Sequence, residues 1–231
     1  MIENSDFETF LYISKNKYQI FVFDKNNLKN LYNEEININD GIESNILSKF
    51  LEDNIYKIEK MIKNFIRNII LIIEDDRVLD IGLSIKKKNF EKYTDQKNLE
   101  NNLVEVKDIF RENYKDQIIM HMIIVDNNKS ENNHSLNNLK QNNDFLFLEV
   151  NFISVPNNFT GYFDKLLENQ QIKITNYMSG KYIKSYFSED QTELSVIANK
   201  LNNGLNNNEV KIISKNPKNK RFFEKFFQLF S

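Results

Sequence analysis

Near the start of the chain, two apolar runs flank a short polar turn in the pattern of a β-hairpin. Residues 10–14 and 18–23 are rich in β-branched and aromatic side chains and flank a polar turn at residues 15–17. Two such runs around a short polar turn predict antiparallel strands. A third strand is expected over residues 28–35, after the polar turn 24–27. The chain is therefore predicted to open with a three-stranded antiparallel sheet.

Helical periodicity follows in residues 44–66. Apolar side chains recur there at three- and four-residue steps, and Ser44 stands where a helix N-cap belongs. Residues 68–73 are almost continuously apolar, which is typical of a strand buried on both faces. A second apolar stripe with helical spacing consists of Leu99, Leu103, Val106 and Phe110. The pattern predicts two helices, each with one core face, and a central strand between them.

The rest of the chain alternates strands with short helices. Strands are expected over residues 77–88, 118–126, 145–155, 172–177 and 210–214, and helices over 158–169, 180–187 and 193–201. The polar, asparagine-rich stretch 127–143 is expected to be a surface loop. Pro217 cannot continue a strand ladder, so it sets off a distinct tail. This order of elements predicts an α/β protein.

Composition removes several classes of function. With 31 basic against 33 acidic residues the net charge is -2, so no global basic field exists to hold nucleic acid, and no nucleic-acid partner is expected. The chain has no cysteine, two histidines and five glycines. These counts give no basis for a disulfide, a zinc site, a histidine-based nucleophile or a glycine-rich phosphate loop. We expect no catalytic residue, no metal and no cofactor.

Location is also suggested by the sequence. The absence of cysteine fits a reducing compartment. Residues 1–10 carry acidic side chains and lack the apolar core of a secretory signal. We therefore expect a cytoplasmic protein.

We interpret three polar features inside the chain as structural and not as binding or catalytic sites. Glu74, Asp75 and Asp76 could bind a divalent cation, but their spacing matches no calcium loop, so a solvated turn is expected. His121 is flanked by apolar residues on a strand and is expected to make a core hydrogen bond. The lysines 86–88 are expected to form an exposed edge that blocks strand aggregation.

The tail, residues 217–231, has the sequence PKNKRFFEKFFQLFS. On a helical wheel its apolar side chains gather on one side, which is typical of a helix lying in an anionic membrane surface. Because ordering the helix costs free energy, one tail should bind weakly and reversibly. The alternative is that this helix packs on the protein's own core. The candidate membrane-binding residues are Lys218, Lys220, Arg221, Phe222, Phe223, Lys225, Phe226, Phe227, Leu229 and Phe230.

Several phrases follow one another in a familiar order. They are FLYISKNKYQIFVFD (residues 10–24), NIILIIEDDRVLDIGLSIKKKN (68–89), IIMHMIIVD (118–126), LFLEVNFISVP (146–156) and NFTGYFDKLLENQQIKITNYMSGKYIKSYFSED (158–190). In this order they resemble the N-terminal half of FtsA, a family of bacterial cell-division proteins that act as actin-like membrane adaptors, and His121 falls on a position of a histidine-containing phrase there. The resemblance covers roughly residues 10–196. It implies an actin-like (RNase H-like) half with an inserted SHS2-type subdomain and a C-terminal amphipathic helix.

Two departures from the family bear on nucleotide binding. Where the family's first phosphate loop has an acid, any residue, a glycine and a hydroxyl, this chain has Tyr12, Ile13, Ser14 and Lys15. The carboxylate that would organise magnesium and the glycine that lets backbone N–H groups approach phosphate are both replaced. The family's second phosphate loop and most of its C-terminal half have no counterpart after Val196. The loop at Tyr12, Ser14 and Lys15 is therefore interpreted as degenerate, and the protein as not an enzyme.

The resemblance implies a division of the chain and a role. The expected segments are 1–66 (first part of the actin-like subdomain 1A), 67–169 (the SHS2-like subdomain), 170–214 (return to the actin-like body) and 215–231 (membrane-targeting tail). The implied role is a non-catalytic cell-division adaptor, peripheral on the cytoplasmic face of the inner membrane. It would contact division proteins and copies of itself. The FtsZ-binding part of the family lies in the missing half, which puts FtsZ contact in doubt. A PilM-like pilus or secretion scaffold, or a nucleotide-binding actin-like ATPase, are the alternatives.

Overall fold

A computed structural model of the chain describes residues 6–39, 41, 44–88, 96–125 and 145–211. The chain divides into two units. The body unit comprises Met1–Leu79 and Val155–Leu205, and the inserted unit comprises Asp80–Ser154 and Asn206–Ser231. Each unit has its own sheet.

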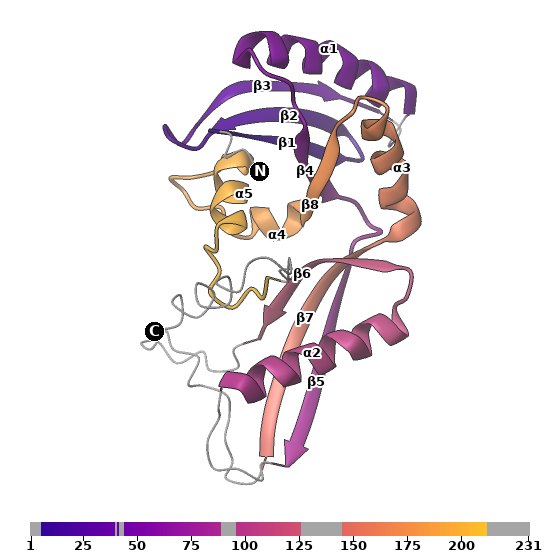
Figure 1. The fold of residues 1–231 in the computed structure, drawn as a ribbon, viewed down its shortest axis with the longest axis vertical. Helices are drawn as coiled ribbons and strands as arrows, with labels where there is room; N and C mark the ends of the chain where they lie inside the picture. The colour runs from indigo at the N-terminus through magenta and orange to yellow at the C-terminus, as the bar shows by residue number, and fades with distance from the viewer. Residues whose placement is uncertain (1–5, 40, 42–43, 89–95, 126–144, 212–231) are drawn as a thin grey trace, which may run out of the picture. The chain divides into compact units, whose positions relative to one another are not determined.

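The body unit is built on a five-stranded sheet. β1 (Phe7–Ser14), β2 (Lys17–Asp24) and β3 (Lys29–Asn37) are antiparallel neighbours. β4 (Asn68–Glu74) pairs parallel with β1, and β8 (Lys173–Ser179) pairs parallel with β4. The order across the sheet is β3-β2-β1-β4-β8 (Figure 1). The opening hairpin, the third antiparallel strand and the doubly buried β4 confirm the sequence predictions.

Four helices accompany this sheet. They are α1 (Ser44–Ile62), α3 (Asn157–Glu168), α4 (Gly180–Lys184) and α5 (Leu194–Asn202). Figure 1 shows α1 along one side of the sheet and α4 and α5 along the other. The apolar face of α1 buries Leu47, Leu51 and Ile58 completely. Burial on both sides explains why β1 and β2 read as nearly continuous apolar runs.

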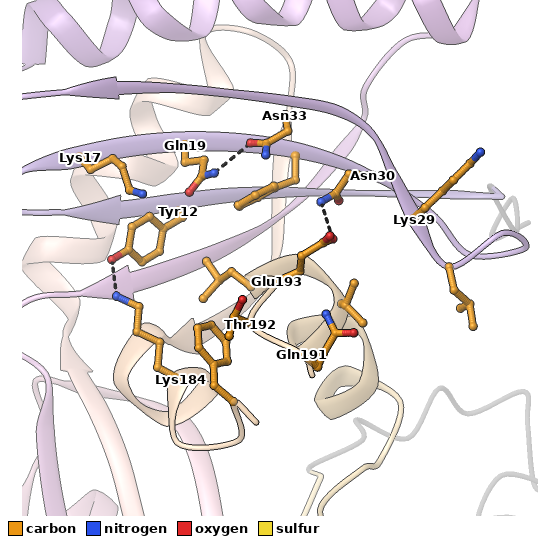
Figure 2. Close-up of a pocket in the computed structure, with 15 residues that line it drawn as sticks. Tyr12, Lys17, Gln19, Lys29, Asn30, Asn33, Lys184, Gln191, Thr192 and Glu193 are labelled. Carbon is orange, nitrogen blue, oxygen red and sulfur yellow. Dashed lines mark hydrogen bonds between the residues drawn. The ribbon is translucent and has the colours of Figure 1, made fainter. Parts of the chain in front are cut away.

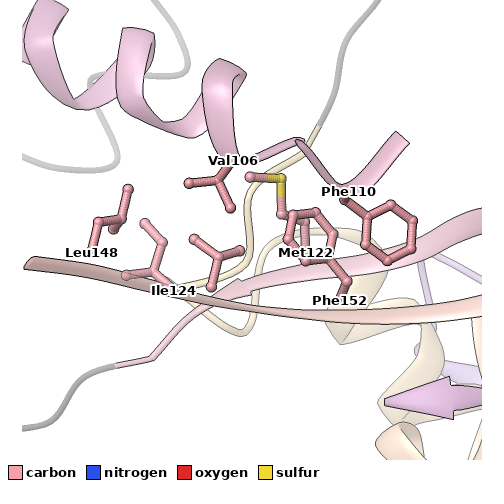
Figure 3. Close-up of a cluster of buried hydrophobic side chains, with 7 residues drawn as sticks. Val106, Phe110, Met122, Ile124, Leu148 and Phe152 are labelled. Atoms are coloured by element: carbon pink, nitrogen blue, oxygen red, sulfur yellow. The ribbon is translucent and has the colours of Figure 1, made fainter. Parts of the chain in front are cut away.

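The inserted unit consists of a strand, a helix and two further strands. These are β5 (Leu79–Lys88), α2 (Gln96–Asn113), β6 (Gln117–Ile124) and β7 (Phe145–Pro156), with strand order β5-β7-β6. The Phe110 ring of α2 stacks on Phe152 of β7 with ring centroids 4.5 Å apart. Figure 3 shows the fully apolar cluster around them. It consists of Val106, Phe110, Met122, Ile124, Leu148, Val150 and Phe152.

A segment after α5 closes the free side of β6. The N–H of Ile124 donates to the carbonyl of Asn208 at 2.9 Å, and the N–H of Val210 donates to the carbonyl of Met122 at 2.8 Å. Between these bonds, Nδ1 of the buried His121 lies 2.7 Å from Oε1 of Glu209. The expected core hydrogen bond of His121 is confirmed. Most of the expected strand 210–214 lies outside the described residues, and the described contact with β6 is a single bridge between Ile123 and Glu209.

The α/β class is confirmed, because each unit combines a sheet with helices and the body sheet mixes antiparallel and parallel strands. The division of the chain differs from the expected inserted segment 67–169. β4 belongs to the body unit because it pairs with β1, and α3 belongs there because it packs on β8. In the parts of the chain that the structure describes, no helix is long and apolar enough to span a membrane. The expected loop 127–143 and the tail 215–231 lie outside the described residues.

Candidate functional site

The carboxyl ends of β1, β4 and β8 meet at one edge of the body sheet. The register aligns Ser14 with Glu74, and Ile73 with Ser179. Ligands of α/β proteins generally bind just outside this edge, because the strands end there and helix starts and loops face the same space. The degenerate loop at Tyr12, Ser14 and Lys15 belongs to this edge.

Three side chains close the edge by binding one another. The Tyr12 hydroxyl donates to Oε2 of Glu74 at 2.9 Å. Nζ of Lys184 lies 2.6 Å from the same Glu74 oxygen and donates to the Tyr12 hydroxyl at 3.2 Å. The Lys184 ammonium also lies 5.3 Å from the centre of the Tyr12 ring, within the range of a cation–π contact. We call Tyr12, Glu74 and Lys184 the Tyr12 cluster.

The cluster shifts the titration of two of its members. Burial raises the pKa of the Tyr12 phenol, and the hydrogen bond to the Glu74 carboxylate raises it further, against an opposing effect of Lys184. Burial disfavours the charged form of Lys184, yet hydrogen bonds to Glu74 and Tyr12 leave its pKa above the usual value. A neutral phenol and an ammonium ion are therefore the stable forms around the Glu74 carboxylate at neutral pH.

A glycine makes this closure possible. A Cβ at position 180 would lie 2.9 Å from both Cβ and Oε2 of Glu74 and 3.2 Å from Cε2 of Tyr12. These distances are shorter than ordinary van der Waals contacts. Gly180 therefore lets the first turn of α4 approach the carboxylate, and Ser179 Oγ caps that turn by accepting the N–H of Tyr182 at 3.3 Å.

The other two loop residues are engaged by their own surroundings. Ser14 Oγ lies 2.9 Å from Oδ1 of Asn16 and 3.1 Å from the carbonyl of Lys17, so its hydroxyl donates within the β1–β2 turn. The ammonium of Lys15 forms an exposed ion pair with Asp76. Position 14, where the family has glycine, carries a side chain that fills the turn.

The acidic triplet is divided among three separate basic groups. Glu74 binds Lys184, Asp76 binds Lys15, and Asp75 accepts Nε of Arg77 at 2.7 Å and Nη2 at 2.9 Å. The Arg77 hydrogen bond is the main cause that lowers the pKa of Asp75. The expected solvated turn is wrong for Asp75, whose side chain is 4% exposed and is bound by Arg77. Among the described residues, no three metal-ligating side chains come together.

Beside the Tyr12 cluster lies a groove that local sequence patterns did not indicate. We call it the hairpin groove. Its volume is about 600 Å³, and it is bounded on one side by β1, β2 and β3 and on the other by α4, the segment after it and the start of α5 (Figure 2). The polar pairs Gln19–Asn33 and Asn30–Glu193 cross or border it. Its lining comes from distant parts of the chain, so only the strand pairing and the return of α4 and α5 bring it together.

The candidate membrane-binding residues fall in residues 217–231 and lie outside the described part of the chain. The structure therefore adds no contact to their description. They stay a prediction from helical periodicity.

Comparisons with known proteins give similarity of fold only. No protein-family model matches the chain, and no curated protein sequence matches it. A PilM-PilN type IV pilus biogenesis complex contains a chain with TM-score 0.44 and 9% identity, covering 78% of this chain and 49% of that chain. The cytoplasmic domain of EpsL, an inner-membrane component of the type II secretion system of Vibrio cholerae, has TM-score 0.37 and 9% identity, over 76% of this chain and 57% of that one.

A third solved structure has a similar fold. It is a Bacteroides thetaiotaomicron protein with an actin-like ATPase fold and unknown function, with TM-score 0.31 and 12% identity, covering 80% of this chain and 58% of that chain. This chain thus spans about half of the first of these structures and less than three fifths of the other two.

Proposed function

We propose that the chain is a non-catalytic actin-like adaptor that binds partner proteins at a membrane surface. The observation that supports this most is the closed Tyr12 cluster. Glu74 and Lys184 neutralise each other at the strand edge where a nucleotide's phosphates would need uncompensated positive charge. The hydroxyl of Tyr12, which stands where the FtsA family has an acidic residue, donates its hydrogen bond to the same Glu74 carboxylate. An adaptor needs a stable surface at this edge, whereas an ATPase needs an open one.

The tail supplies the proposed membrane contact. Residues 217–231 would lay their phenylalanines in the acyl boundary and their lysines and arginine among anionic headgroups. One such helix binds weakly, so attachment would be reinforced by self-association or by a tethered partner. On this account the protein is cytoplasmic and peripheral on the inner membrane.

Vesicle sedimentation tests the membrane contact. The full chain is mixed with vesicles of equal parts phosphatidylglycerol and phosphatidylcholine, beside a chain that lacks residues 217–231. We expect the full chain to pellet and the shortened one to stay in the supernatant. A double substitution of Phe223 and Phe226 by serine should reduce pelleting, while Gln228→Ser on the polar side should not. Equal pelleting of the full and shortened chains would refute the membrane contact.

The partner decides between two versions of the adaptor. The first is an FtsA-like role in cell division, which follows from the order of sequence phrases and would involve division proteins. The second is a PilM-like scaffold of a pilus or secretion system, which the closed cluster and the tail would serve equally well. A two-hybrid comparison of the chain against division proteins and against pilus and secretion proteins separates them. Binding to division proteins alone supports the first, and binding to the other set alone supports the second.

A further inference from the structure

The hairpin groove is large enough to hold a ligand. Its volume of about 600 Å³ falls in the range of pockets that hold ligands. One wall comes from residues of β2 and β3, and the other from the segment between α4 and α5 together with the start of α5 (Figure 2). A floor of Phe21, Leu194 and Val196 is buried to 8% exposure or less. A groove with an apolar floor that is lined by strand residues suits an extended chain.

Leu28 stands at the rim of this groove in a strained conformation. Its φ is 52°, in the left-handed region that favours glycine and asparagine, and its side chain is 61% exposed. The preceding turn is held firmly, because the Asp24 carboxylate accepts the N–H groups of Asn26 and Asn27 at 2.8 and 3.1 Å. A bulky apolar residue is thus kept exposed beside the groove in a backbone conformation that disfavours it. Such strain is a reason to consider a binding role for the position.

The walls carry side-chain amides in positions to recognise peptide groups. Nε2 of Gln19 donates to Oδ1 of Asn33 at 2.9 Å, which leaves the Gln19 oxygen and the Asn33 amino group toward the groove (Figure 2). Nδ2 of Asn30 donates to Oε2 of Glu193 at 3.3 Å. Its Oδ1 is buried without a hydrogen-bond partner among the described residues.

Two lysines of the lining can serve acidic groups. Lys17, Lys29 and Lys184 line the groove, but Glu74 neutralises Lys184 at 2.6 Å. Lys17 binds Glu35 at 3.1 Å and keeps about a third of its side chain exposed. An ammonium group has three donors, so Lys17 can serve a further acceptor. The lining therefore favours acidic groups on whatever docks there.

From these four features we propose that the hairpin groove docks an extended segment of a partner protein that carries a bulky apolar side chain beside acidic residues. The apolar side chain lies on the floor and against Leu28, and the acidic residues face Lys17 and Lys29. The inference rests on the proposed adaptor function, for which it names the surface that receives the partner.

The test starts from a library of random twelve-residue peptides displayed on phage and selected on the immobilised full chain. Enriched peptides are synthesised with a fluorescent label, and their binding is measured by anisotropy. We expect peptides that combine acidic residues with a bulky apolar residue. Leu28→Asn should weaken their binding about tenfold, because it removes apolar contact. The unfolding free energy should be unchanged or higher, because asparagine tolerates the left-handed conformation.

Three further variants separate the effect of charge from that of apolar contact. Lys29→Gln should weaken binding about threefold, with a larger effect at low salt. Leu205→Asn and Lys57→Gln, exposed positions that do not line the groove, should leave binding unchanged. The proposal is overturned if no peptide is enriched, if the enriched peptides lack acidic or apolar residues, or if Leu28→Asn binds them as the parent does. Failure of vesicle pelleting would instead refute the membrane contact and leave peptide docking standing.

Discussion

The phenol of Tyr12 donates a 2.9 Å hydrogen bond to Oε2 of Glu74, 62 residues further along the chain on the neighbouring parallel strand. Lys184, which follows the last strand of the sheet, reaches the same oxygen at 2.6 Å. Residues from three strand ends thus satisfy one another at the edge where α/β proteins usually hold a ligand. The predictions below follow from this closure and from the contacts around it.

Gly180→Ala should destabilise the body unit. The new methyl group would meet Cβ and Oε2 of Glu74 at 2.9 Å, and overpacking of this kind costs about 1–3 kcal/mol. Gly161→Ala is the matched control: it lies inside α3, where no described heavy atom would approach its Cβ within 4 Å. Alanine there should raise the unfolding free energy by about 0.5–1 kcal/mol through helix propensity. Urea unfolding measures both, and equal effects of the two substitutions would contradict the close packing at Gly180.

Tyr12→Phe should change how stability depends on alkaline pH. The folded-state pKa values of Tyr12 and Lys184 are both raised. Their contribution is therefore fully present below the unfolded-state pKa of about 10 and is lost as the pH rises through the folded-state values. Tyr12→Phe should cost about 1 kcal/mol at pH 7 and make the loss above pH 10 shallower. Urea unfolding from pH 8 to 11 measures this, with Tyr56→Phe, an exposed tyrosine, as the control.

Asp75→Asn should change stability at the acid end. Arg77 lowers the folded-state pKa of Asp75, so the contribution of this pair is present above the unfolded-state value of about 4 and is lost as the pH falls through the folded-state value. The substitution should remove about 2 kcal/mol at pH 7 and progressively less as the pH falls below the unfolded-state value. Thermal unfolding at pH 7, 4 and 3 measures the difference. A constant difference across this range would show that the carboxylate charge is not what matters.

Glu209→Ala should loosen the segment that closes β6. The carboxylate sits 2.7 Å from Nδ1 of the buried His121, between two backbone bonds to Ile124 and Val210. Its removal should speed hydrogen exchange of the Ile124 and Val210 amides about tenfold or more while leaving the amides of β1 unchanged. Glu149→Gln, on β7 of the same sheet, is the comparison variant. Unchanged exchange at Ile124 would mean that the backbone bonds alone hold the segment.

Much of the architecture could be predicted from residue patterns. The paired apolar runs of the hairpin, the single core face of α1 and the apolar strand β4 are local signals, and the structure has each element within a few residues of its expected place. The inserted segment 80–154 proved shorter than the expected 67–169, because pairing partners are not a local property. Nothing in the run 68–73 says that it pairs with β1, 60 or so residues away, instead of with the strand that follows it.

The sites were harder to predict than the elements. The sequence showed that Tyr12 and Lys15 depart from a phosphate loop, but Lys184, which completes the cluster, has no signal other than its place after the last strand. Asp75 was expected to be solvated because the sequence shows neither its burial nor its hydrogen bonds with Arg77. The hairpin groove combines side chains from three strands and two helices, and the strain at Leu28 is a backbone property that composition does not reveal.

The central claim is that the strand edge around Tyr12 is closed to nucleotide, and calorimetric titration of magnesium ATP into the full chain tests it most directly. The account predicts no saturable heat, meaning no binding tighter than about 1 mM. A one-site isotherm with a micromolar Kd that Gly180→Ala weakens would place a nucleotide at the Tyr12 cluster and contradict the proposed adaptor.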